Sequence, residues 1–240
     1  MRKVHIFIPC FVDQLYPSVG FNMVKLLEKA GCEVSYSANQ TCCGQPAFNA
    51  GFKGEAKEVC IKFLDDFKQA ETIVTPSASC AGFIKNYYTG LLEETPYKHA
   101  AQKIKARIFE LSDFLVNRIE FTDFGAELNT IATYHDSCAA LRECKVKQEP
   151  RILLGKVKGL ELKEMNDVET CCGFGGTFAV KFESISIAMA DQKIHHASQT
   201  GAATLVSTDM SCLMHIDGCM KHQQKDIKVM HLADVLTSGW

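Results

Sequence analysis

The stretch Gln40-Thr41-Cys42-Cys43-Gly44-Gln45-Pro46 decides how this chain is organised, because it occurs twice. It returns 129 residues later as Glu169-Thr170-Cys171-Cys172-Gly173-Phe174-Gly175. Single cysteines repeat around it at offsets of 128 and 132, as the pairs Cys10 with Cys138 and Cys80 with Cys212. One Cys-Cys-Gly triplet could arise by chance, but two triplets with matching flanking cysteines indicate a tandem repeat.

Each copy of the repeat shows strand and helix patterns in alternation. In the first copy, short apolar runs predict strands at Val4–Ile8, Cys32–Tyr36 and Thr72–Thr75. Between them, helix-spaced apolar residues predict helices at Val19–Ala30 and Gly54–Ala70. The second copy predicts strand Ile131–Tyr134, helix Ser184–Gln199 and strand Ala203–Ser207. Strands separated by helices favour parallel pairing with helices on both sheet faces. The predicted class is therefore α/β, with two similar three-layer halves at 1–122 and 130–240, joined within the polar segment Glu120–Thr130.

The composition excludes several classes of protein. Among 240 residues, 47% are apolar and 22% are charged, and the formal charge is −2. This balance argues against nucleic-acid binding. No apolar run approaches the ~18 residues of a membrane span, and the first residues lack a signal-peptide cleavage site. Without a secretory signal, twelve cysteines indicate metal or redox chemistry in a reducing, cytoplasmic compartment rather than disulfides.

The repeated cysteines have a spacing that suits an iron–sulfur cluster. They are too far apart for the short loops of zinc ribbons or bacterial ferredoxins, so the fold must assemble each site from separate loops. The single cysteines follow predicted strands, where ligand sites of parallel sheets gather. A vicinal pair grips one small ion poorly, whereas a polynuclear cluster accepts adjacent thiolates. The predicted ligands are Cys10, Cys42, Cys43 and Cys80 in the first half and Cys138, Cys171, Cys172 and Cys212 in the second.

These motifs resemble the CCG cysteine-rich domain family, which includes the cysteine-rich component of heterodisulfide reductase and iron–sulfur components of glycolate and anaerobic glycerol-3-phosphate dehydrogenases. The resemblance covers essentially the whole chain. The opening Ile8-Pro9-Cys10-Phe11-Val12-Asp13-Gln14-Leu15-Tyr16-Pro17 and the segment Thr41–Asn49 are most similar to the branch of the family involved in lactate utilization.

The resemblance implies a cytoplasmic electron-transfer subunit of an oxidoreductase complex that oxidises L-lactate to pyruvate. Its partners would be lactate utilization protein B, which is a ferredoxin-like iron–sulfur protein, and lactate utilization protein C, which completes the complex. This chain would not be catalytic alone. The alternatives are a heterodisulfide-reductase-like thiol/disulfide subunit, a subunit acting on another 2-hydroxy acid, and a zinc-stabilised interaction scaffold.

The chain departs from the full family pattern at two positions. A terminal C-x-x-C would add a fifth cysteine to each half, but Ser77 precedes Cys80 and Asp209 precedes Cys212. Four cysteines per half imply up to two ordinary [4Fe–4S] clusters and put heterodisulfide reduction in doubt. Zinc is the alternative occupant expected in aerobic preparations.

Three other residues lie near the predicted ligands. Ser77 and Asp209 are expected to cap helices, with Asp209 as an alternative oxygen ligand. His135, three residues before Cys138, is a candidate modulator of the cluster; a hydrogen-bonded histidine at a strand end is the alternative.

Overall fold

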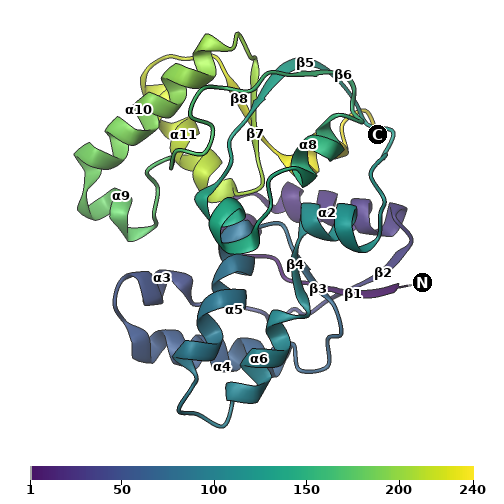
Figure 1. Cartoon of the computed structure of the whole chain (residues 1–240), viewed down its shortest axis with the longest axis vertical. Coiled ribbons are helices and arrows are strands. Elements are labelled where there is room, and N and C mark those ends of the chain that lie inside the picture. The colour runs from purple at the N-terminus through teal and green to yellow at the C-terminus, as the bar shows by residue number, and fades with distance from the viewer. Residues whose placement is uncertain (1) are drawn as a thin grey trace.

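The computed structural model describes residues 2–240, which form two parallel four-stranded sheets (Figure 1). The first sheet has the strand order β2-β1-β3-β4, and the second has the order β6-β5-β7-β8. The strands are β1 (Arg2–Ile6), β2 (Cys32–Tyr36), β3 (Ile73–Thr75), β4 (Ile108–Glu110), β5 (Glu127–Tyr134), β6 (Lys158–Leu162), β7 (Thr204–Ser207) and β8 (Lys228–His231). Every neighbouring pair of strands is parallel, so the predicted α/β class is confirmed.

Helices flank both sheets, and Figure 1 shows α3 to α6 in the lower lobe and α9 to α11 in the upper lobe. The helices of the first half are α1 (Cys10–Leu15), α2 (Pro17–Lys29), α3 (Gln45–Asn49), α4 (Lys53–Asp66), α5 (Ala78–Leu91), α6 (Lys98–Lys105), α7 (Leu111–Asp113) and the π-helical η1 (Phe114–Arg118). Those of the second half are the π-helical η2 (Ala140–Cys144), α8 (Glu149–Leu154), α9 (Thr177–Lys181), α10 (Glu183–Gln199), α11 (Met210–His222) and α12 (Leu232–Leu236). The predicted helices correspond to α2, α4 and α10, with shifted ends.

The repeat extends to the register of the strands. The backbone N–H of Phe7 donates to the carbonyl of Val74 at 2.9 Å, and that of His135 donates to the carbonyl of Val206 at 2.8 Å. Phe7 and His135 therefore occupy the same position, just after the second strand of each sheet. This correspondence allows the two halves to be compared residue by residue.

Three strands lie outside the sequence prediction. The edge strand β4 has three residues, all buried, and is too short to show a period of two. Its counterpart β8 and the largely exposed β6 also lack a continuous apolar run. In addition, β5 begins at Glu127, four residues before the predicted start.

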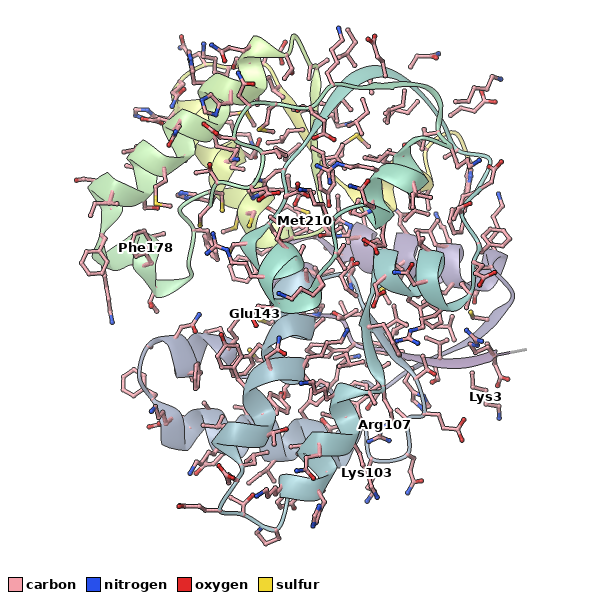
Figure 2. The ribbon with its side chains drawn as sticks, in the orientation of Figure 1. Lys3, Lys103, Arg107, Glu143, Phe178 and Met210 are labelled. Atoms are coloured by element: carbon pink, nitrogen blue, oxygen red, sulfur yellow. The ribbon has the colours of Figure 1, made fainter. Side chains whose placement is uncertain are left out.

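The two halves share one hydrophobic core. Buried side chains of β1 and α2 pack in the same cluster as those of β5, β7 and α12. At a second contact, η2 lies against α5, where Asn86 and Tyr87 donate hydrogen bonds to the Glu143 carboxylate at 2.8 and 3.2 Å. A Cβ on Gly82 would lie 2.4 Å from the Glu143 Cβ, so only glycine permits this approach. Figure 2 shows Glu143 and Met210 near the middle of the molecule, where the lobes meet.

Two other predictions concern the chain as a whole. Division into units at 1–122 and 130–240 stays a prediction. Within residues 2–240, no helix is both long and apolar enough to cross a bilayer.

A buried carboxyl at the end of β4 makes stability depend on pH. Glu110 is fully buried, and its Oε2 accepts hydrogen bonds from the N–H groups of Ser112 (2.8 Å) and Asp113 (3.2 Å). Burial raises its pKa from about 4.5 to about 8. The folded chain therefore holds a proton that the unfolded chain loses above about pH 4.5. Its contribution to stability is complete below that pH and is lost as the pH rises to about 8.

We expect Glu110→Gln to remove this part of the pH dependence, because the amide cannot ionise and its oxygen can still accept the two N–H groups. Between pH 5 and pH 9, the free energy of unfolding of the parent should fall by on the order of 3–5 kcal/mol more than that of the variant. Urea unfolding of the parent and the variant at pH 5, 7 and 9 measures this difference in the free energy of unfolding. The exposed Glu94→Gln is the control, and parallel profiles for parent and Glu110→Gln would contradict the prediction.

Candidate metal centres

The four predicted cysteines of the first half converge beyond the carboxyl ends of the strands. Cys10 begins α1 after β1, the vicinal pair lies between β2 and α3, and Cys80 lies in the first turn of α5. The sulfurs of Cys10 and Cys42 are 3.9 Å apart, and those of Cys43 and Cys80 are 3.2 Å apart. We call these four sulfurs the first centre.

The second half repeats this arrangement. Cys138 follows β5, the vicinal pair precedes α9, and Cys212 lies in the first turn of α11. The sulfurs of Cys172 and Cys212 and one ring nitrogen of His135 all lie within 4.8 Å of one another. We call the sulfurs of Cys138, Cys171, Cys172 and Cys212 the second centre. None of the eight cysteines forms a disulfide in the described residues 2–240.

In both centres two cysteines are buried and two are more exposed. Cys10 is exposed and Cys42 is half-buried, whereas Cys43 and Cys80 are buried. In the second half, Cys172 and Cys212 are buried and the other two thiols are half-buried. Each centre thus has an inner side within the core and an outer side toward solvent.

One cysteine of each vicinal pair is held as a thiolate. Hydrogen bonds from Cys10 and Cys43 lower the pKa of Cys42 to about 3. In the second half, hydrogen bonds from Cys138 and Cys172 lower the pKa of Cys171 to about 2. Thiolate is the form that binds metals, so both centres are electrostatically prepared for cations.

Glycine shapes the backbone after each vicinal pair. Gly44 and Gly173 have φ values of +91° and +90°, and their N–H groups donate to the sulfurs of Cys42 and Cys171 at 3.4 Å. A Cβ on Gly173 would lie 2.5 Å from the carbonyl oxygen of Ser186. The left-handed conformation and the close approach to the next helix both require glycine.

This donor set fits an iron–sulfur cluster. Four sulfurs converge in each half, and soft thiolates are the ligands that iron–sulfur clusters prefer. Backbone N–H donors and the first turns of α5 and α11 face a site that would be anionic when loaded. The vicinal cysteines also suit several irons better than one ion.

The two capping predictions have different outcomes. Ser77 is the N-cap of α5, and its Oγ accepts the N–H of Cys80 at 3.4 Å, as predicted. Asp209 occupies the N-cap position of α11, but among residues 2–240 its side chain makes no cap bond to that helix. Its Oδ1 instead accepts the N–H of Ser79 at 3.2 Å, at the start of α5 in the other half. The prediction for Asp209 was therefore correct for its position and wrong for its partner, which is 130 residues away in sequence.

His135 lies where the sequence placed it but without the hydrogen bond of the alternative interpretation. The ring is fully buried, and within residues 2–240 neither nitrogen has a hydrogen-bond partner. Burial, and then the charge of Lys193, lowers its pKa to about 3. The alternative of a hydrogen-bonded histidine is wrong, and the unpaired ring nitrogen that lies next to Cys172 and Cys212 favours contact with a bound group.

Sequence reasoning missed Lys193. This lysine of α10 is 1% exposed, and its Nζ donates to the carbonyl oxygens of Asp167 (2.6 Å) and Val168 (3.1 Å). Burial lowers its pKa, and the charge of Cys172 acts in the opposite direction. The available signal was its place on the buried face of a helix, next to Ile194, where lysine is rare.

A small pocket opens beside the second centre. It has a volume of about 220 Å³ and lies where the halves meet, lined by Phe48 and Tyr87 of the first half and Cys138 and Arg142 of the second. Phe48 follows the first vicinal pair closely in sequence. Of the eight predicted ligands only Cys138 lines this pocket, and Phe48 also packs against the buried cluster that contains Cys43 and Cys80. A larger hollow of about 500 Å³, beside Lys163 and His196, lies away from the cysteines.

Comparison with known proteins agrees with the repeat. The model of the CCG family, described as a cysteine-rich domain, matches residues 4–85 and 132–217. The chain is 45% identical over 234 residues to lactate utilization protein A of Halalkalibacterium halodurans, covering 98% of this chain and 96% of that one. It is 42% identical over 238 residues to lactate utilization protein A 2 of Bacillus cereus strain AH820, covering 99% and 98%.

A solved structure shares the fold. A hypothetical protein from Helicobacter pylori superposes with a TM-score of 0.67 at 12% identity, covering 98% of this chain. This chain spans 48% of the length of that protein. The two domain matches and the full-length relatives establish that the chain belongs to the CCG cysteine-rich domain family and is a relative of the lactate utilization A proteins.

Proposed function

We propose that this chain is the iron–sulfur electron-transfer subunit of a cytoplasmic complex that oxidises L-lactate to pyruvate. The observation that carries the proposal is the pair of four-cysteine centres, each assembled from three separate loops at the strand ends. The eight cysteines would hold two clusters, which accept and release single electrons when bound. The names of the full-length relatives support lactate utilization as the process.

The proposal gives this chain two partners. Lactate utilization protein B would supply a ferredoxin-like iron–sulfur protein, and lactate utilization protein C would complete the complex. Cys10 is exposed and Cys138 is half-buried, so both lie on the side from which such a partner could exchange electrons. Substrate chemistry would belong to the complex and not to this chain alone.

Iron and acid-labile sulfide per chain, measured after anaerobic purification, test the proposal. We expect about eight of each, together with a visible absorption band that dithionite bleaches. Stoichiometric zinc without sulfide, persisting after anaerobic cluster reconstitution, would contradict it and favour a zinc-stabilised scaffold. If clusters are present, L-lactate should reduce them only when both partner proteins are added. Reduction by lactate in the isolated chain would contradict the division of labour.

A further inference from the structure

The two centres have different surroundings on their inner sides. Phe7 and His135 occupy the same position after the equivalent strands, as their hydrogen bonds to Val74 and Val206 show. Both side chains are fully buried. The first half thus places a phenyl ring where the second half places an imidazole.

A second pair of positions differs in the same way. A Cβ added to Gly44 would lie 3.4 Å from the carbonyl of Ala56, and one added to Gly173 would lie 2.5 Å from the carbonyl of Ser186, so these carbonyls are equivalent. Phe63 lies seven residues after Ala56, and Lys193 lies seven residues after Ser186. Phe63 and Lys193 are therefore counterparts on α4 and α10.

These positions are neighbours within each half. In the first half, the rings of Phe7 and Phe63 pack edge to face with centroids 5.0 Å apart. In the second half, one ring nitrogen of His135 lies within 4.8 Å of the sulfurs of Cys172 and Cys212. The charge of Lys193, which is buried on α10, acts on this ring. An aromatic pair behind the first centre is thus replaced by an imidazole and an ammonium group behind the second.

We propose that His135 and Lys193 make the second centre the more easily reduced of the two, with His135 contacting it through a ring nitrogen. The inference rests on the proposed function, because it concerns the clusters that the eight cysteines would hold. Reduction adds one negative charge to a cluster. A buried cation and a ring nitrogen that can donate to sulfur or bind iron stabilise that charge, whereas two phenyl rings do not. One electron lost by the first centre would then be gained by the second.

The two centres are linked by contacts between the residues next to their cysteines. Phe11, next to Cys10, packs edge to face against Phe174, which follows the second vicinal pair, with ring centroids 5.7 Å apart. At the other side of the interface, Asp209 bonds to Ser79, the residue before Cys80. Residues adjoining one centre therefore touch residues adjoining the other.

A redox titration of the full-length, cluster-loaded chain, monitored by electron paramagnetic resonance, tests the proposal. We expect two one-electron steps whose equilibrium constants differ at least tenfold, which corresponds to about 59 mV. Protein labelled with ¹⁵N-histidine should show a nitrogen coupling only in the signal of the more easily reduced centre. Equal potentials, or no coupling at either centre, would overturn the proposal even if no variant folded.

Variants test whether His135 and Lys193 cause the difference in ease of reduction between the two centres. His135→Phe should abolish the nitrogen coupling. The double variant His135→Phe/Lys193→Phe should lower the equilibrium constant for reduction of the more easily reduced centre at least tenfold, and that of the other centre should not change. Lys193→Met, which keeps the length of the side chain without its charge, should produce part of that shift. The exposed His195→Phe on the same helix is the control and should change neither step. An unchanged equilibrium constant for the more easily reduced centre in the double variant would overturn the proposal. Absence of iron and sulfide from the parent would instead overturn the proposed function, and this inference with it.

Discussion

Replacing Cys80 by alanine is expected to remove about half of the iron and sulfide from the anaerobically purified chain. Cys80 supplies the sulfur that lies 3.2 Å from that of Cys43, on the buried side of the first centre. A cluster held there by three thiolates would be labile, whereas the second centre has its own four cysteines. Iron and sulfide analysis of the purified variant measures the loss.

A matched control separates ligand loss from damage to the fold. Cys32 lies in β2 of the same half and is also buried, but it has no counterpart in the repeat. Cys32→Ala removes the same sulfur atom from the core and should retain the full iron content. In the second half, Cys212→Ala is compared with Cys219→Ala, which removes a half-buried sulfur from the same helix α11. Complete loss of iron from Cys80→Ala would show that the two centres do not load independently, and full retention would show that Cys80 is not a ligand.

The repeat made most of this arrangement predictable from sequence. Matching cysteines and matching helix patterns lie in the chain itself, so the α/β class, the two sheets and the convergence of the cysteines could be inferred without coordinates. The short strand β4 could not, because three buried residues carry no periodicity. Its counterpart β8 is four residues long and likewise has no continuous apolar run that would predict a strand.

Features that depend on contacts between distant residues were beyond the sequence. Whether His135 finds a hydrogen-bond partner depends on side chains from other elements, and its pattern in the chain resembles that of any histidine after a strand. Lys193 carried a local signal, a lysine on the apolar face of α10, but its correspondence to Phe63 of α4 follows from the packing of Gly44 and Gly173 against the two helices. Asp209 has the local sequence of a helix cap, yet its carboxylate accepts hydrogen bonds from Ser77 and Ser79 of the other half and not from the N–H groups of α11.

The Asp209 carboxylate is a buried polar link between the halves. It is 1% exposed, and it accepts hydrogen bonds from Ser77 (2.9 Å), Ser79 (3.1 Å to Oγ) and Ser137 (2.6 Å). Ser79 adjoins Cys80 and Ser137 adjoins Cys138. One side chain therefore fixes the loops of both centres.

We expect Asp209→Ala to destabilise the chain by about 3 kcal/mol or more, because it leaves several buried donors without their charged acceptor. For a chain of this size, that corresponds to a fall in Tm of roughly 6–12 °C. Asp209→Asn keeps one acceptor oxygen for Ser77 and Ser79, so its loss should be about 1 kcal/mol. Thermal unfolding of the parent and both variants at constant pH, after iron and sulfide have been removed from all three, measures the loss.

The same substitution should also affect both centres, which distinguishes it from loss of a single ligand. Asp209→Ala should lower iron in the two halves together, since the serines that it releases precede Cys80 and Cys138, whereas Cys80→Ala should empty one. The exposed Asp191, which bonds Gln223 within the second half, is the control, and Asp191→Ala should leave Tm and iron nearly unchanged. If Asp209→Ala unfolds like the parent, the halves are held together by their shared apolar core, and the carboxylate contributes little. If it is destabilised but retains all its iron, the carboxylate joins the halves without positioning the ligands.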